Sequence, residues 1–151
     1  MTPTPPSSLF HAYRRHGRQV LWADSNPIFC QLFDDWGCGW SDGGCRVLAD
    51  ALMQVLADMS PQQVAILNRD NRTQHVLVSV SIDNQEWYVD GDGVSSQQKL
   101  LHRWQTEEFI DSPHLAPYQP EHSDIRAAAE WSDALAAHLI NNLSEQQTLG
   151  A

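Results

Sequence analysis

The sequence predicts a single α+β domain in which helices flank a small antiparallel sheet. Apolar residues recur every three or four positions over 45–59 and again over 123–143, as they do on the buried face of a helix. Between these segments, 75–82 and 86–90 alternate apolar and polar residues on either side of a short polar turn, which is typical of a β-hairpin. Because the strands lie next to one another in the chain and the helices lie outside them, an antiparallel sheet is expected.

A proline-rich end and a glycine-rich loop precede the first of these helices. Residues 1–8 are rich in Pro, Ser and Thr, which predicts a disordered N-terminus. Asn26 followed by Pro27 is typical of an N-cap and first helical position, and it predicts a short helix that ends near residue 36. The glycines of 37–44 allow left-handed backbone angles and a close approach to a ligand, so this loop is expected to be functional.

The central elements follow in chain order. The helix that begins at Cys45 is stopped by Ser60-Pro61, and the apolar run 64–67 predicts a short strand before the hairpin. After the hairpin, Gly91-Asp92-Gly93 ends the strand and Ser95 is expected to cap a second helix. The apolar residues of that helix are Leu100, Leu101 and Trp104.

The C-terminal part of the chain is predicted to be a loop followed by a long helix. Several prolines indicate the loop, and the helix is expected from about Ser123 to Leu143. There is no internal repeat or linker, so 9–145 is predicted to be one domain and 146–151 a flexible tail. The prolines of the loop are Pro113, Pro117 and Pro120.

An acidic net charge limits the classes of partner. With 19 acidic and 9 basic residues, the formal charge is -10, and such a surface repels nucleic acids and anionic membranes. The first residues lack the basic and apolar regions of a signal peptide, and no stretch is long enough to span a bilayer. A cytoplasmic location is therefore expected, and export by a dedicated system is compatible with it. Nothing in the sequence predicts the oligomeric state.

Cys45 lies directly after the glycine pair Gly43-Gly44, at the start of a predicted helix. The unpaired N–H groups and the positive end of the helix dipole at such a position favour a thiolate over a thiol. The sequence therefore predicts Cys45 as a sulfur nucleophile. The structural alternative is a small buried residue at a tight loop-to-helix junction.

His75 and Asp90 lie at the outer ends of the two hairpin strands. Antiparallel pairing returns the chain to its starting edge, so the two side chains are expected to lie roughly opposite one another. An imidazole lowers the pKa of a neighbouring thiol, and a carboxylate fixes the orientation of the imidazole. We predict a triad of Cys45, His75 and Asp90. Asp92 is the alternative acid, and Asp90 is favoured because it ends the alternating strand.

Three motifs together resemble the catalytic core of the papain-like cysteine peptidase superfamily, over roughly residues 36–94. They are Gly-Gly-Cys at a helix start, His-Val-Leu-Val on a strand, and Trp-Tyr-Val-Asp-Gly-Asp-Gly at the end of the next strand. The order Cys, His, Asp is similar to that of the transglutaminase-like and arylamine N-acetyltransferase-like branches. The resemblance implies a papain-like fold, with a helix that carries the cysteine at its N-terminus packed on a small antiparallel sheet. It also implies Cys45 as nucleophile, His75 as base and Asp90 as orienting acid.

The loop before Cys45 is expected to contact the substrate. Backbone N–H groups of Cys45 and of the adjoining glycines are candidates for stabilising an oxyanion. The tryptophans of this loop, Trp36 and Trp40, are compatible with lining a substrate groove or with packing against the core, and Asp42 is also a candidate helix cap. The expected substrate and oxyanion residues are Trp40, Asp42, Gly43 and Gly44.

No metal and no cofactor are expected. The three cysteines Cys30, Cys38 and Cys45 are separated by seven and six residues, which is wider than the spacing of a zinc knuckle. Cys30 and Cys38 are therefore predicted to be buried or inert. The acidic segment 90–93 lacks the spaced ligands of an EF-hand calcium loop.

The chemistry that these residues predict is acyl transfer from an amide, ester or thioester. The expected function is a thiol-dependent hydrolase, a peptidase or amidase, that acts on a peptide or protein substrate. Two alternatives remain at this stage. One is a non-catalytic binding module that keeps the papain-like fold and grips a protein through the loop 36–40. The other is a small effector or toxin that modifies a host protein by the same thiol chemistry.

Overall fold

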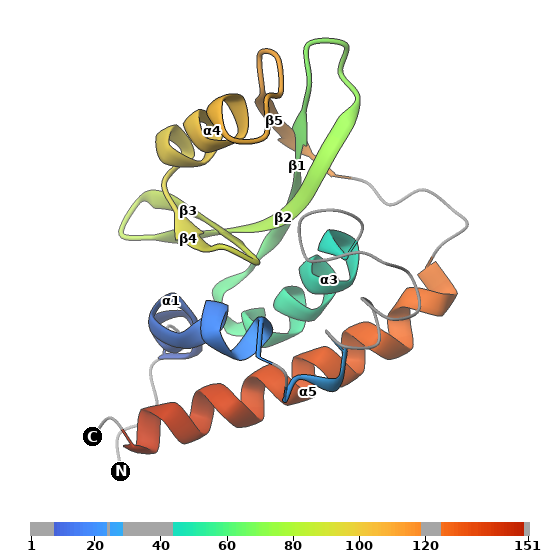
Figure 1. The fold of residues 1–151 in the computed structure, drawn as a ribbon. Helices are drawn as coiled ribbons and strands as arrows, with labels where there is room; N and C mark the ends of the chain where they lie inside the picture. The colour runs from blue at the N-terminus through green and yellow to red at the C-terminus, as the bar shows by residue number, and fades with distance from the viewer. Residues whose placement is uncertain (1–7, 24, 29–43, 119–124, 150–151) are drawn as a thin grey trace.

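The computed structural model describes residues 8–23, 25–28, 44–118 and 125–149, which form a mixed α+β fold around one antiparallel sheet (Figure 1). The described strands follow the order β4-β3-β2-β1-β5 across the sheet. They are β1 (Gln62–Leu67), β2 (Thr73–Ile82), β3 (Gln85–Asp90), β4 (Gly93–Ser95) and β5 (His114–Pro117). The α-helices of the described segments are α1 (Ser8–Leu21), α3 (Cys45–Val55), α4 (Gln97–Thr106) and α5 (Ile125–Leu149).

The sheet separates two apolar clusters. Alternate residues of β2 and β3 point to opposite faces, as the pleat of a strand requires. The larger cluster joins α1, α3 and α5 to one face through Val76, Val78, Val80 and Val89. The smaller cluster lies under α4 on the other face, and its buried members are Ile66, Leu77, Tyr88, Leu100 and Trp104 (Figure 1).

Helix α3 forms where the three-to-four spacing of apolar residues predicted it. Val47, Leu48 and Leu52 are buried in the larger cluster, so the predicted packing of this helix face against the sheet is confirmed. The helix ends at Val55 and is followed by a 3₁₀ turn, Ala57–Met59, which brings the chain to the predicted stop at Ser60-Pro61.

The central hairpin is confirmed, and a two-residue loop connects its strands. Asp83 and Asn84 both have positive φ angles, 52° and 67°, which is the type I′ geometry that matches the twist of a hairpin. Ile82 pairs with Gln85 across this turn. The predicted strand over 64–67 is also present, as the longer strand β1, and its pairing with β2 shifts register between Ile66 and Leu67.

Two short strands replace predicted turns and loops. Gly93 does not simply break the hairpin, because it starts β4 and pairs with Asp90 across a tight turn. Strand β5 lies within the predicted proline loop, where it pairs with the edge strand β1. Short edge strands bury few side chains and therefore leave a weak periodic signal. The cap of α4 is Ser96 and not Ser95, since the Ser96 hydroxyl accepts from the backbone N–H of Lys99.

The two ends of the described chain are more helical than expected. Helix α1 begins at Ser8, inside the segment expected to be disordered, and was not predicted. Helix α5 continues past Leu143 to Leu149, into the expected tail. Asn26 does cap a helical turn as predicted, because its side-chain oxygen accepts from the N–H of Ile28 at 3.1 Å. The remainder of the helix predicted up to residue 36 lies outside the described residues.

Candidate active site

Cys45 is the first residue of α3 and is 9 % exposed. The N-cap is Gly44, a buried residue with no side chain, and its carbonyl accepts the first helical bond from Leu48 at 3.1 Å. The N–H groups of the first turn have no acceptor within the helix, and they lie at the positive end of its dipole. The thiol is therefore placed where a negative charge, on sulfur or on a bound oxygen, is favoured.

His75 lies on β2 and is 1 % exposed. Its ring stacks on that of Trp104 from α4, with centroids 4.4 Å apart and 25° between the planes. The register shift between β1 and β2 falls beside this residue, where Ile66 pairs with His75 and Leu67 pairs with Thr73. A bulge of this kind changes the direction of a strand and of its side chains. The imidazole is thus fixed by packing on one side and by an irregular strand on the other.

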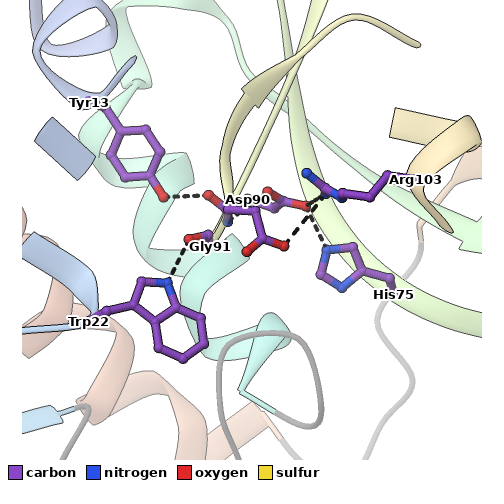
Figure 2. Close-up of polar contacts among 7 residues, drawn as sticks. Tyr13, Trp22, His75, Asp90, Gly91 and Arg103 are labelled. Atoms are coloured by element: carbon purple, nitrogen blue, oxygen red, sulfur yellow. Dashed lines mark hydrogen bonds and ion pairs between the residues drawn. The ribbon is translucent and has the colours of Figure 1, made fainter. Parts of the chain in front are cut away.

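Asp90, the last residue of β3, contacts His75 directly. Nε2 of His75 donates to Oδ2 of Asp90 at 3.1 Å, and the carboxylate is 3 % exposed (Figure 2). The predicted contact is present, but it is diagonal. Val89 pairs with Val78, and continuing this register places Asp90 opposite Leu77. A diagonal pair still lies within reach of a long or aromatic side chain.

Asp92, the alternative acid, takes a different position. Its backbone N–H donates to Oδ1 of Asp90 at 3.0 Å, and its own carboxylate lies 3.7 Å from Arg103. Asp90 is the carboxylate that His75 contacts, as favoured from the sequence. Asp92 instead helps to orient Asp90 through the backbone of the turn.

Helix α1 holds the backbone of the acid from the opposite side. The Tyr13 hydroxyl donates to the carbonyl of Asp90 at 2.5 Å, and the Trp22 indole N–H donates to the carbonyl of Gly91 at 2.9 Å (Figure 2). Tyr13 is 1 % exposed. Burial, together with the negative charges of Asp90 and Asp92, raises the pKa of Tyr13 well above its usual value, so the hydroxyl remains a neutral donor.

Arg103 of α4 reaches the same carboxylate. Its Nη2 donates to Oδ2 of Asp90 at 2.9 Å, so that one oxygen accepts from both His75 and Arg103 (Figure 2). Arg103 and Trp104 are neighbours in α4, and both side chains contact the site. The half-buried Arg103 binds Asp90, and the buried Trp104 packs on His75.

The thiol and the imidazole shift each other's pKa. Burial alone would raise the pKa of the Cys45 thiol, but hydrogen bonding to His75, the charge of that imidazole, the backbone of Val76 and the charge of Arg46 together lower it. Burial alone would lower the pKa of His75, but hydrogen bonds to Asp90 and Cys45, together with their charges, raise it to about 9. Both shifts favour a thiolate beside an imidazolium.

The ring nitrogens of His75 have separate partners. Nε2 is engaged by Asp90, whereas Nδ1 is buried and makes no hydrogen bond of good geometry with any described residue. Nδ1 is therefore the nitrogen left to interact with the Cys45 sulfur, and this contact is long or poorly aligned. Such geometry is common between catalytic groups without a substrate and tightens when one binds.

The structure brings together Cys45, His75, Asp90 and Gly44. Three of the expected substrate-loop residues, Trp40, Asp42 and Gly43, lie outside the described residues, as do Trp36, Cys30 and Cys38. The sequence pattern did not identify the residues that hold Asp90, the turn after it and the ring of His75. Trp104 was recognised only as an apolar residue of its helix, and no spacing connects the other three to Asp90. These missed residues are Tyr13, Trp22, Arg103 and Trp104.

The described segments also bear on metal binding and membrane insertion. No group of three or more His, Cys, Asp or Glu side chains there is placed to hold a metal ion. No helix there has both the length and the apolar character needed to cross a membrane.

Comparison with known proteins gives no family assignment. No protein-family model, no curated protein and no solved structure matches this chain.

Proposed function

We propose that this protein is a thiol-dependent acyl hydrolase with a papain-like fold, in which Cys45 is the nucleophile, His75 the base and Asp90 the orienting acid. One observation carries the proposal. Asp90 engages one ring nitrogen of His75 and leaves the other, buried and without a well-formed hydrogen bond among the described residues, beside Cys45. Activation of a thiol requires that one ring nitrogen of the imidazole contacts the acid and the other faces the sulfur.

The papain-like fold is supported by the relation of the elements to the chemistry. A helix with the thiol at its first residue packs on one face of an antiparallel sheet. The histidine lies on the strand that contacts this helix, and the acid ends the next strand.

The proposed reaction begins with a proton held by His75 and a thiolate on Cys45. The sulfur attacks the carbonyl carbon of an amide, and the carbonyl oxygen takes up the negative charge. Backbone N–H groups at the start of α3 point away from the helical hydrogen-bond ladder and are proposed to stabilise this oxyanion, which in other acyl-transfer enzymes is worth about 3–4 kcal/mol per donor. Collapse of the intermediate breaks the carbon–nitrogen bond, and the imidazolium gives its proton to the leaving amine.

The second half of the reaction restores the enzyme. Neutral His75 takes a proton from water as the water oxygen attacks the thioester carbonyl; the carbon–sulfur bond then breaks, which returns the Cys45 thiolate beside the imidazolium and releases the carboxylic acid. Asp90 keeps the imidazole in one tautomer and one orientation through both halves. The proposed substrates are peptides, isopeptides or glutamine-type side-chain amides in a protein, and no external cofactor enters either step.

Selective alkylation tests this proposal. Iodoacetamide at mildly acidic pH is expected to label Cys45 much faster than Cys30 and Cys38, because its thiolate persists below the pH at which ordinary thiols ionise. The His75→Ala variant should lose this preference, and His114→Ala, a change of a histidine outside the site, should keep it. Equal labelling of all three cysteines would contradict the proposal and leave a non-catalytic binding module as the better account.

A further inference from the structure

Arg103 forms an ion pair with the acid at the oxygen that the histidine uses. Its Nη2 lies 2.9 Å from Oδ2 of Asp90, and Nε2 of His75 lies 3.1 Å from the same atom. Arg103 is 21 % exposed, and its guanidinium also lies 3.7 Å from Asp92 at the edge of the site. A permanently charged group thus competes with the imidazole for one buried carboxylate oxygen.

The position of Asp90 does not depend on Arg103 alone. Oδ1 accepts from the N–H of Asp92 at 3.0 Å, and the Asp90 carbonyl accepts from the Tyr13 hydroxyl. His75 is itself held by its stack on Trp104. Because these contacts remain when the guanidinium is removed, loss of Arg103 is expected to change the electrostatic balance of the acid more than its location.

Within the described residues, each element packed around the pair contributes charged or titratable groups. Helix α1 provides neutral Tyr13, α3 provides Cys45 and Arg46, the β3–β4 turn provides Asp92, and α4 provides Arg103. Arg46 acts on the sulfur, whereas Arg103 acts on the acid. A cation next to an imidazolium disfavours the protonated form, so Arg103 opposes the effect of Asp90 on His75.

We propose that Arg103 is a positioning residue that shares Oδ2 of Asp90 with His75 and thereby weakens the stabilisation of the His75 imidazolium by this carboxylate. This inference rests on the proposed function. An imidazolium that is too strongly stabilised is a poor general acid, because the proton must move to the leaving amine when the carbon–nitrogen bond breaks. With the pKa of His75 already raised to about 9, a second donor on Asp90 limits any further rise.

The test is an NMR titration of His75 in full-length protein labelled with ¹⁵N-histidine, with the signal assigned by its loss in His75→Ala. Arg103→Gln removes the charge and keeps a donor, and it is expected to raise the midpoint of His75 by about one pH unit or more. Arg103→Lys keeps the charge and should leave the midpoint near that of the wild type. Lys99→Gln, which removes the same charge from the exposed side of α4, is the matched control and should leave it unchanged.

An unchanged midpoint in Arg103→Gln would overturn the inference. A lower midpoint would also overturn it, because it would mean that Arg103 anchors Asp90 against His75. If Arg103→Gln does not fold, Arg103→Met and Asp92→Asn replace it. Arg103→Met is expected to raise the titration midpoint of His75, because the guanidinium is lost. Asp92→Asn is expected to lower that midpoint, because the guanidinium then pairs with Asp90 alone. The opposite shift in whichever of these variants folds contradicts the inference.

Failure of the proposed function would look different. In that case wild-type Cys45 shows no preference for iodoacetamide at mildly acidic pH, whatever the Arg103 variants do to His75. If Cys45 is selectively alkylated and the Arg103→Gln titration is unchanged, only the role of Arg103 is refuted.

Discussion

The Tyr13→Phe variant tests whether α1 positions the acid of the site. The change removes one hydroxyl and keeps the ring, so the apolar packing of Tyr13 is preserved. The hydroxyl donates to the carbonyl of Asp90 at 2.5 Å in a buried setting, and the variant leaves that carbonyl without this donor. Loss of such a bond costs about 2 kcal/mol of unfolding free energy. For a chain of this size, this lowers Tm by roughly 4–8 °C.

Thermal unfolding followed by circular dichroism measures this cost, and alkylation of Cys45 measures its effect on the site. Tyr88→Phe is the matched control. Tyr88 is also buried, at 7 % exposure, but its hydroxyl makes no hydrogen bond with the described part of the chain. We expect Tyr13→Phe to lower both Tm and the rate at which iodoacetamide labels Cys45, and Tyr88→Phe to change neither by a comparable amount. Equal effects of the two variants would refute the claim that α1 holds the acid in place.

Two further predictions concern packing and pH. Gly17→Ala should lower the unfolding free energy by about 1–3 kcal/mol, because a Cβ at Gly17 would lie 2.5 Å from Cδ2 of Tyr13. This loss is opposite to the usual gain from alanine in a helix. Denaturant unfolding measures the change, with Gln19→Ala at an exposed position as the control, and an increase in stability would contradict the prediction. The pKa of His75 rises from 6.5 to about 9 on folding, so its contribution is complete below about pH 6.5 and is lost as the pH rises towards 9, by at most about 3 kcal/mol. Chemical denaturation between pH 6 and 9 should show this loss in the wild type and much less of it in His75→Ala; identical profiles would refute the assigned shift.

The predictable part of the fold is the part with strong periodicity. The helix that starts at Cys45 and the hairpin around Asp83-Asn84 follow directly from apolar spacing and from turn residues that tolerate positive φ. Strand β5, by contrast, has only intermediate or exposed residues, and no buried face produces an alternating pattern there. Its position depends on pairing with β1, which sequence periodicity does not encode.

Helix α1 was missed although its buried residues do recur at helical intervals. Phe10, Tyr13, Gly17 and Leu21 lie three or four residues apart, but a glycine in a helix interior and several arginines weaken the signal. The glycine has a packing reason, since the ring of Tyr13 occupies the space that a larger residue would fill. Gly17 has a low helix propensity, and it leaves the space in which the Tyr13 ring packs to reach the site.

The candidate site was predictable where its residues lie at element ends. Hairpin geometry connected His75 with Asp90, and the apolar face of the helix that starts at Cys45 predicted packing on the sheet that brings the thiol to them. Arg103 and Tyr13 could not, because their contacts with Asp90 depend on how α4 and α1 pack on opposite sides of the sheet edge. Sequence reasoning thus identified the groups proposed to react and missed those that hold the acid.

Trapping of an acyl group on Cys45 tests whether this thiol, activated by His75, is the nucleophile of the site. The wild type and the His75→Ala variant are mixed with p-nitrophenyl acetate, and the cysteine peptides are analysed by mass spectrometry as p-nitrophenol release is followed. If Cys45 is the nucleophile, the wild type forms an acetyl thioester on Cys45, with a burst of p-nitrophenol followed by slower turnover, and His75→Ala shows little of either. Acetylation spread equally over Cys30, Cys38 and Cys45, or a Cys45 thioester that forms as fast without His75, would contradict it.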